Sequence, residues 1–376
     1  MNIEPLGTDA PAIVYIDFKS PYAYLAVAPT RELERELGVA FDWRPFVLDI
    51  PSYLGSARLG KSGEVVEQNR SAEQWSGVKY AYYDCRRYAR LRGQTIRGTE
   101  KIWDTNLIAT AMLWARQRGE AAVHRFIDTV YPPFWVRELD VESEEVVAGV
   151  LDSLDLDGTA FLAWAHAEGL AANERLQTDA FAAGVYGVPT YVVGEERYFG
   201  REHLPRIRWQ LQGGEGASPD VANTLPLQLP EQVPPPDSIT VGIDTTLDSL
   251  LGLPRLLALL KGYQGQVEWV RITPRKPPAM PPEDDRSRAA MHKRWRYENQ
   301  SANARRYSPQ GVSPGDYGDA IATLLANNAI VLSDSGPDQI VHTAMPGIAV
   351  LVGEELFIGR QHLPLLAVRL GVAFEG

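Results

Sequence analysis

The stretch AIVYIDFKSPYAYLA, residues 12–26, decides the fold. Its first part, residues 12–18, has the length and the β-branched content of a buried strand. Ser20 and Pro21 follow as a typical helix start, because serine caps the free N–H groups and proline suits the first turn. The sequence VAFDWRPF, residues 39–46, predicts the next strand. A strand, a short helical crossover and a second strand predict parallel pairing.

The rest of the first half predicts a long helical region and then a return to strands. Between residues 72 and 171, apolar residues recur every three or four positions, which is typical of amphipathic helices. Strand patterns follow at residues 190–194 and 197–200, ahead of a helix from about His203. We therefore expect an α/β domain into which a large helical segment is inserted.

The second half repeats this plan. VGEERYFGREHLP, residues 193–205, and VGEELFIGRQHLP, residues 352–364, are identical at nine of thirteen positions. The strand patterns at 238–244 and 267–269 correspond to those at 13–17 and 41–43. The same elements in the same order predict a tandem duplication, with a second copy shortened by loss of most of the helical insertion.

Proline and glycine mark the expected domain boundaries. Residues 212–238 are rich in both and predict a linker, because these residues interrupt helix and sheet. We expect one domain over residues 10–211, with its insertion at about 72–171, and a second over 239–376. TPRKPPAMPP, residues 273–282, predicts a loop inside the second domain.

Composition excludes several classes of protein. The 376 residues carry a formal net charge of −11, which argues against nucleic acid as a partner. Cys85 is the only cysteine, so an internal disulfide, a CxxC pair and a cysteine-cluster zinc site are excluded, and we expect no metal. No signal-like N-terminus and no long apolar run are present, which predicts a soluble, cytoplasmic protein without a membrane partner.

Four separated motifs point to a known family. They are IDFKSPYAYLA (16–26), DTNLIATAMLWARQRG (104–119), FW with the acidic helix after it (134–151), and AGVYGVPTYVVGEERYFG (183–200). In this order they resemble the 2-hydroxychromene-2-carboxylate isomerase family. That family is similar to the kappa-class glutathione transferases, within the DsbA-like branch of the thioredoxin fold. The resemblance covers nearly all of the first half and implies a thioredoxin core with an inserted helical domain. Together with the internal repeat it predicts two thioredoxin-like domains, of which the first has the helical insertion.

The resemblance implies a glutathione site around Ser20. Ser20 stands where thioredoxins keep their reactive CxxC, and its hydroxyl is expected to donate to the glutathione thiolate. A helix N-terminus favours a thiolate as well. The alternative is that Ser20 acts only as a helix cap. Val188 and Pro189 resemble the dipeptide whose proline is cis and whose backbone pairs with the thiol peptide, and a purely structural turn is the alternative.

The remaining implied cofactor-binding residues depart from the family pattern. Glu202 stands where the family usually has the aspartate that holds the γ-glutamyl amine, and Arg201 replaces the small polar residue before it. The alternative is a helix N-terminus at which the acidic residue opposes the dipole. Asn69 lies near the family's asparagine. The family lysine that pairs with the glycine carboxylate is replaced by Gly77, and Lys79 follows half a turn later. A solvated surface lysine is the alternative for Lys79. A solvated helix face is likewise the alternative to an anion pocket for the basic segment 86–97.

The second copy is expected to be catalytically degenerate. There Leu247 aligns with Ser20 and is followed by Asp248, and neither can donate a hydroxyl to a thiolate. Met345–Pro346 is expected to be cis like Val188–Pro189, without facing a ligand.

The resulting prediction is a glutathione-dependent isomerase or transferase. Its substrate is expected to be a small conjugated electrophile, aromatic or carrying a carboxylate. Disulfide exchange is excluded because Cys85 lies in the helical insertion. The alternative from another class is a non-catalytic thioredoxin-like binding or scaffold protein. The duplication is compatible with a monomeric pseudo-dimer or with a homodimer.

Overall fold

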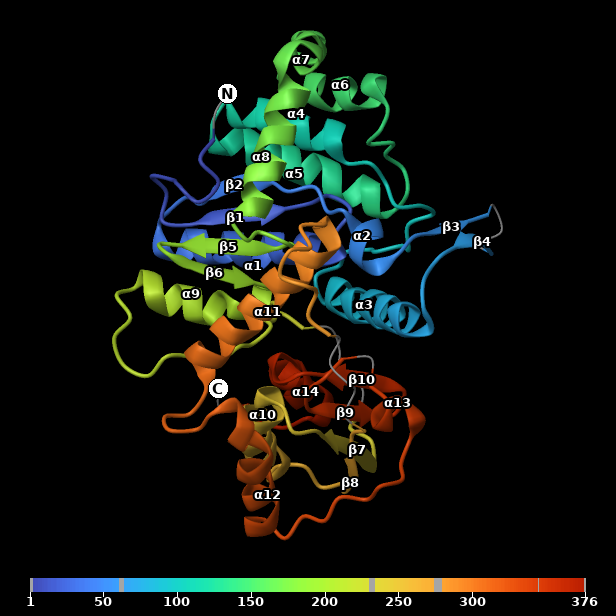
Figure 1. Cartoon of the computed structure of the whole chain (residues 1–376), viewed down its shortest axis with the longest axis vertical. Helices are drawn as coiled ribbons and strands as arrows, with labels where there is room; N and C mark the ends of the chain where they lie inside the picture. The colour runs from blue at the N-terminus through green and yellow to red at the C-terminus, as the bar shows by residue number, and fades with distance from the viewer. Residues whose placement is uncertain (1–2, 61–63, 230–233, 274–278, 344, 375–376) are drawn as a thin grey trace. The chain divides into compact units, whose positions relative to one another are not determined.

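The structure is a computed structural model that describes residues 3–60, 64–229, 234–273, 279–343 and 345–374. Contacts divide the chain into two compact units (Figure 1). The first contains Met1–Arg201 and Pro281–Asn299, and the second contains Glu202–Met280 and Gln300–Gly376. No helix in the described part of the chain has the length and hydrophobicity to cross a membrane.

The first unit is built on a four-stranded sheet. Its strands are β1 (Ile13–Ile16), β2 (Asp42–Pro45), β5 (Thr190–Val193) and β6 (Glu196–Phe199), in the order β2-β1-β5-β6. The β1–β2 pair is parallel, as the sequence predicts, and the other pairs are antiparallel. All residues of β1 and β5 are buried, which explains their continuous apolar sequences.

Helix α1 (Pro21–Leu37) connects β1 to β2. It begins at Ser20, whose Oγ accepts a hydrogen bond from the backbone N–H of Ala23 at 3.2 Å. It ends at Gly38, which has a φ of 65°, a conformation that glycine adopts readily. Pro29 lies inside the helix without ending it.

Three short elements after β2 were not predicted. They are α2 (Ile50–Leu54) and the hairpin of β3 (Ala57–Leu59) and β4 (Val65–Gln68). The four residues of β4 are exposed, so this strand lacks the alternation of apolar and polar residues that marks a half-buried strand.

The predicted helical insertion is present and extends beyond residue 171. It comprises α3 (Ala72–Leu91), α4 (Asn106–Arg116), α5 (Glu120–Trp135), α6 (Glu144–Asp152), α7 (Gly158–Trp164), a π-helical turn (Ala165–Gly169) and α8 (Leu170–Ala182). Figure 1 shows α4 to α8 grouped on one side of the first sheet, where α4 and α5 contact β2.

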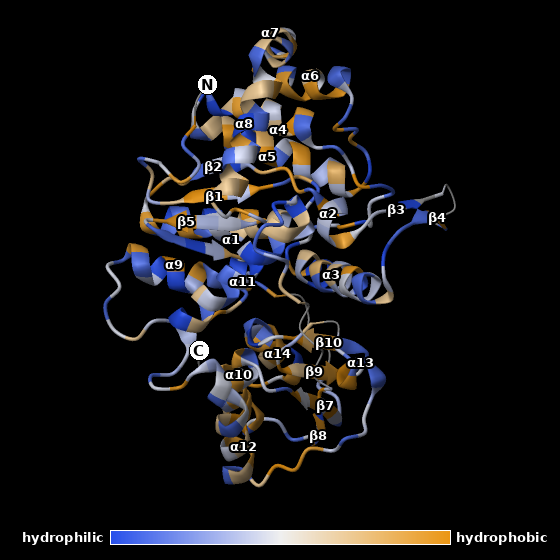
Figure 2. Cartoon of the chain, viewed as in Figure 1, coloured by the Kyte–Doolittle hydropathy of each residue, from blue (hydrophilic) through white to orange (hydrophobic). Residues whose placement is uncertain are grey.

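The second unit contains a sheet with the same strand order and the same pairing directions. β7 (Ser238–Ile243) pairs in parallel with β8 (Gln266–Arg271) and antiparallel with β9 (Ala349–Val352), which pairs with β10 (Glu355–Ile358). Figure 2 shows that β1 of the first sheet and β7 and β9 of the second are mostly hydrophobic. The second half of the chain thus forms a second four-stranded sheet with the topology of the first.

Helix α9 (Leu204–Leu211) follows a 3-10 turn at Arg201–His203 and confirms the helix predicted from about His203. The second half contains α10 (Leu247–Leu260), α11 (Arg288–Tyr307), α12 (Tyr317–Asn327), α13 (Asp338–Val341) and α14 (Leu363–Leu370), with 3-10 turns at Pro314–Asp316 and Arg360–His362. The first part of α11 belongs to the first unit, where His292 stacks on Tyr53 with ring centroids 4.0 Å apart.

The expected linker contains residues that pack on the second unit. Val221 and Asn223 are buried, and the Asp220 carboxylate pairs with Arg360 at 2.9 Å. Residues 230–233 of this segment, and residues 274–278 of the expected proline-rich loop, lie outside the described part of the chain. The domain boundaries proposed from sequence therefore remain predictions.

The expectation of two cis prolines was half right. Val188–Pro189 is cis, whereas Met345–Pro346, which also lies within the described residues, is not. The sheet explains the difference. Gly200 donates to the carbonyl of Pro189 at 3.0 Å, and Gly359 donates to that of Ile348 at 2.7 Å, so Ile348 corresponds to Pro189 in the second sheet.

Candidate functional site

Ser20, Pro189 and Arg201 come to one edge of the first sheet. Tyr15 of β1 pairs with Thr190, so the chain leaves β1 toward Ser20 at the edge where Pro189 leads into β5. Strand β6 returns to that edge, where Gly200 hydrogen-bonds the Pro189 carbonyl and Arg201 follows. Residues distant in sequence therefore meet at the start of α1.

The turn before Ser20 is held by a buried carboxylate that sequence analysis did not single out. Asp17 Oδ2 accepts from the Leu48 backbone at 2.7 Å, and its Oδ1 accepts from the Thr105 hydroxyl at 2.7 Å. Lys19 Nζ lies 3.7 Å from the same carboxylate. Because Asp17 bonds to both the core and the insertion, it fixes where α1 begins.

Ser20 itself is 5% exposed. Its oxygen accepts from Ala23, as a helix cap does, and this leaves the hydroxyl hydrogen for a different acceptor. The neighbouring N–H groups of the first turn and the helix dipole favour a negative charge at this point. Ser20 is therefore a cap, and the cap geometry is compatible with donation to a thiolate.

Arg201 is a buried cation with an unusual environment. It is 5% exposed, and its Nη2 is buried without a hydrogen-bond partner. Its guanidinium carbon lies 4.5 Å from the ring centroid of Tyr88 and 6.0 Å from that of Tyr22. Among the described residues, no carboxylate forms an ion pair with it. Buried charges are normally paired, so Arg201 is suited to an anion from outside the chain.

Helix α3 contributes a polar cluster beside the start of α1. Tyr22 Oη donates to Asp84 Oδ2 at 3.5 Å, and Asp84 pairs with Arg87 at 2.5 Å. Burial raises the pKa of the Tyr22 hydroxyl well above its usual value, and the neighbouring Cys85 and Asp84 add to this. Tyr22 therefore stays protonated and neutral in this cluster.

Cys85 is fully buried in α3, within electrostatic range of Tyr22 and Arg201. Burial raises the pKa of its thiol well above the usual value, and Asp84 adds to the effect, while Arg201 opposes it. Cys85 thus lies closer to the start of α1 than its position in the sequence indicated. It is a thiol held in its protonated, unreactive form.

Asn69 and Lys79 do not join this edge. Both are exposed, and the Asn69 side chain accepts from the backbone N–H of Ser56 at 2.5 Å, which places it in the β3–β4 region. Within the described residues, no contact links Lys79 to Ser20 or Arg201. Glu202 opens the second compact unit.

The basic segment of α3 lines a cavity of about 490 Å³. Arg86, Arg90 and Arg97 contribute to its wall, together with Arg137. Arg86 Nε donates to the Ile96 carbonyl at 3.0 Å, which fixes one edge of its guanidinium. The arginines are exposed, so both earlier interpretations, a solvated face and an anion pocket, stay open.

The corresponding edge of the second sheet is closed by ion pairs. Arg360 occupies the place of Arg201, and its Nη1 lies 2.8 Å from Asp248 Oδ1 in the second position of α10. Asp220 also accepts from Arg360, at 2.9 Å. Although burial opposes it, Arg360 holds the pKa of Asp220 below its usual value.

The cap of α10 corrects the alignment made from sequence. The N-cap is Thr246, whose Oγ1 accepts from Ser249, so Thr246 and not Leu247 corresponds to Ser20. The second unit therefore does have a hydroxyl at its helix start. That hydroxyl donates to Asp244 at 2.6 Å, which occupies its hydrogen.

The sheet order, the α1 start and the inserted helices define a thioredoxin-like protein of the DsbA type. A family model described as a DSBA-like thioredoxin domain matches residues 13–212. The chain belongs to this family.

Curated relatives and a solved structure each match about half of the chain. The chain is 26% identical over 195 residues to 2-hydroxychromene-2-carboxylate isomerase of Sphingobium xenophagum, covering 50% of this chain and 92% of the relative. It is 26% identical over 196 residues to the enzyme of that name from Pseudomonas putida, covering 50% and 88%. A solved 2-hydroxychromene-2-carboxylate isomerase matches with a TM-score of 0.39 and 22% identity, covering 54% of this chain and 93% of that one.

Proposed function

We propose that this protein is an isomerase that uses glutathione and acts on a conjugated electrophile bearing a carboxylate. The observation that carries the proposal is the buried, unpaired Arg201 at the same sheet edge as the Ser20 cap. The names of the curated relatives support isomerisation, and the DsbA-like fold supports a thiol at the start of α1. Glutathione transfer is the other outcome compatible with these residues.

Glutathione, when bound, supplies a nucleophilic thiol that the chain does not supply from Cys85. Ser20 holds this thiol by donating its free hydroxyl hydrogen, while the first turn of α1 favours the ionised form. Addition to the conjugated system permits rotation about the former double bond, and elimination restores the thiol. Ser20 and the first turn of α1 both act by stabilising negative charge at a fixed position.

Arg201 binds a carboxylate in this proposal. Its guanidinium stacks near Tyr88 and Tyr22, which fixes its plane, and its buried Nη2 is left to donate. A carboxylate of glutathione or of the substrate restores charge balance at the site. Asn69 and Lys79 are not required for this arrangement.

The test compares two helix caps in the same chain. Ser20→Ala and Thr246→Ala each remove a capping hydroxyl and are expected to cost about 1 kcal/mol of helix stability. Only Ser20→Ala should weaken glutathione binding and abolish isomerisation of 2-hydroxychromene-2-carboxylate. Calorimetry and an absorbance assay measure these two effects.

Absence of glutathione binding at millimolar concentration in the unmutated protein would contradict the proposal. Equal behaviour of the two alanine variants would contradict the role of Ser20. Binding of glutathione without turnover would favour the non-catalytic alternative. Reduction of a protein disulfide above background would overturn the exclusion of dithiol-type exchange.

A further inference from the structure

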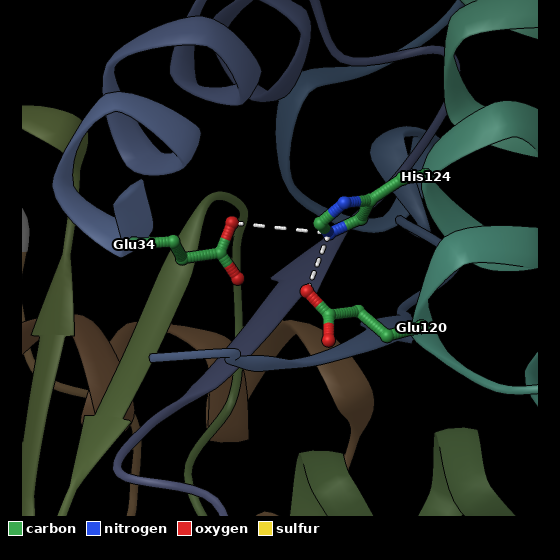
Figure 3. Close-up of side chains that lie close together, drawn as sticks. All are labelled: Glu34, Glu120 and His124. Carbon is green, nitrogen blue, oxygen red and sulfur yellow. Dashed lines mark ion pairs between the residues drawn. The ribbon is translucent and has the colours of Figure 1, made fainter. Parts of the chain in front are cut away.

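Three side chains that the proposed function does not use converge between α1 and α5 (Figure 3). Glu34 lies near the C-terminal end of α1, and Glu120 and His124 lie one turn apart at the start of α5. Because residues four apart share a helix face, Glu120 and His124 point to the same side. Two carboxylates and one imidazole therefore face one another.

The spacing of the donor atoms is unsuited to hydrogen bonds and close to that of metal ligands. His124 Nε2 lies 3.8 Å from Glu34 Oε2 and 3.8 Å from Glu120 Oε1. Both distances exceed those of a hydrogen bond. Two donors bound at about 2.1 Å to one ion lie roughly 3.4 Å apart at a tetrahedral angle and roughly 3.8 Å apart when it opens.

Two of the three donor atoms have no hydrogen-bond partner among the described residues. Glu34 Oε2 and His124 Nε2 are both buried without a hydrogen bond in the described structure, and the Glu34 side chain is 4% exposed. Buried polar atoms nearly always have a partner, so two such atoms facing each other indicate a missing third group. This observation is independent of the clustering of acidic residues.

The surroundings fix the orientation of the proposed ligands. Glu34 Oε1 accepts from the Phe41 backbone at 2.7 Å and from Trp43 Nε1 at 3.1 Å, which directs Oε2 toward His124. Carboxylate ligands are commonly held in this way by hydrogen bonds on their other oxygen. Arg31, the nearby cation, is paired with Asp128 at 2.6 Å.

We propose that Glu34, Glu120 and His124 bind one divalent transition-metal ion, such as Zn²⁺. One imidazole with two carboxylates is a donor set that suits such ions, and three protein ligands leave a position for water. The Glu120 side chain is 45% exposed, so an ion can enter from solvent on its side and Glu120 can then move onto the ion. This site departs from the expectation of no metal drawn from the sequence.

The ion acts as a structural clasp in the first unit. It joins α5 of the helical insertion to α1, and through the Glu34–Trp43 bond to β2 of the sheet. Glu34 lies fourteen residues after Ser20, or about 20 Å along the helix. The metal is therefore remote from the thiol site, and the two proposals stand or fall separately.

Calorimetric titration of the chelator-treated full chain with Zn²⁺ tests the site. We expect one ion per chain, a rise in melting temperature, and at least tenfold weaker binding in His124→Ala and Glu34→Gln. His166→Ala is the matched control. His166 Nε2 lies 3.1 Å from Glu144, but both side chains are more than half exposed and form no three-donor group among the described residues.

Glu120→Gln provides a test that does not depend on folding of the buried variants, because its side chain is partly exposed. It should also weaken Zn²⁺ binding and alter the visible spectrum of the Co²⁺-loaded protein. Failure of the unmutated chain to bind one Zn²⁺ would overturn the proposal, as would wild-type affinity in both His124→Ala and Glu120→Gln. Ser20→Ala should bind Zn²⁺ normally, whatever its effect on glutathione.

Discussion

Arg201 and Arg360 occupy the same place in the two sheets, in identical Gly-Arg pairs after β6 and β10, yet their surroundings differ. Arg360 is neutralised by Asp220 and Asp248. Arg201 lies beside two tyrosine rings, and its buried Nη2 has no hydrogen-bond partner among the residues that the structure describes. Arg360 therefore stabilises its own unit, while the Arg201 charge is available to pair with an anionic ligand.

The second residue of the adjoining helix accounts for much of this difference. Tyr22 holds that position in α1, and Asp248 holds it in α10. The Asp248 carboxylate also accepts from the backbone N–H groups of Ile348 and Arg360, at 3.1 and 3.2 Å, so it fills the helix start from within the chain. An internal anion in the second unit takes the place that a bound ligand has in our proposal for the first.

The largest expected effect is the difference in stability between the two units when the charge of Arg360 or of Arg201 is removed. Arg360→Met leaves Asp248 without its cation, whereas Asp220 keeps Arg255 at 2.8 Å. It should destabilise the second unit by about 3 kcal/mol, because the partly buried Asp248 charge remains unpaired. Arg201→Met removes a charge that has no ion-pair partner in the described part of the chain and should change the stability of the first unit little. Hydrogen exchange of β9 and β5 measures the two units separately.

If hydrogen-exchange protection of β5 fell as much in Arg201→Met as protection of β9 falls in Arg360→Met, the proposed difference between the two arginines would be contradicted. Such a result would mean that the ring contacts of Arg201 do as much for stability as the ion pairs of Arg360. Arg201→Lys, which keeps the charge but loses the planar guanidinium, separates packing from charge.

The next largest effect is expected from placing a carboxylate at the position in the first unit that Asp248 holds in the second. Tyr22→Asp gives Arg201 an internal carboxylate and should weaken glutathione binding by roughly ten- to a hundredfold, the range of a charged hydrogen bond. Calorimetry measures the affinity. Tyr22→Phe keeps the ring without a carboxylate and should bind like the unmutated chain, and undiminished binding by Tyr22→Asp would contradict the role of Arg201.

His203, two residues after Arg201, predicts that the stability of the second unit depends on pH. Burial, reinforced by Arg306 and Arg360, lowers the pKa of His203 to about 3. The unfolded chain binds a proton more readily, so stability is complete above about pH 6.5 and is lost as the pH falls, by at most ~1.4 kcal/mol per pH unit.

Urea unfolding followed through β9 between pH 5 and pH 7 measures this loss. His203→Gln should flatten the pH dependence, while leaving any contribution of the other histidines in place. A dependence of the same steepness in His203→Gln would show that His203 does not cause it.

The smallest effect is expected at the position of the missing family lysine. Gly77 precedes Asp84 by two helical turns, and a Cβ built at Gly77 meets no atom within 4 Å. Gly77→Lys should therefore fit and raise glutathione affinity about threefold, as expected for an exposed ion pair. Gly77→Ala controls for the gain in helix propensity, and equal affinity in both variants would exclude a contact by the lysine.

Local sequence signals predicted the first sheet and α1 well. The apolar run of β1 and the Ser20–Pro21 helix start depend on short-range chemistry, and the structure confirms them as a strand and a helix cap. The strands predicted at 190–194 and 197–200 are confirmed as β5 and β6. The β3–β4 hairpin escaped prediction because its exposed residues have no periodicity, and Thr246 was missed because the two helix starts differ by one residue in spacing.

The sequence by itself determined that the chain begins with a strand, a capped helix and a parallel strand, that it has one cysteine, and that a similar plan recurs. Only the tertiary structure decided which charges are satisfied. Neither Arg201 nor Arg360 carries a local signal of its partner, because the groups that meet them come from distant elements of the sheet edge. Charge pairing depends on distance in space, which the order of residues does not specify.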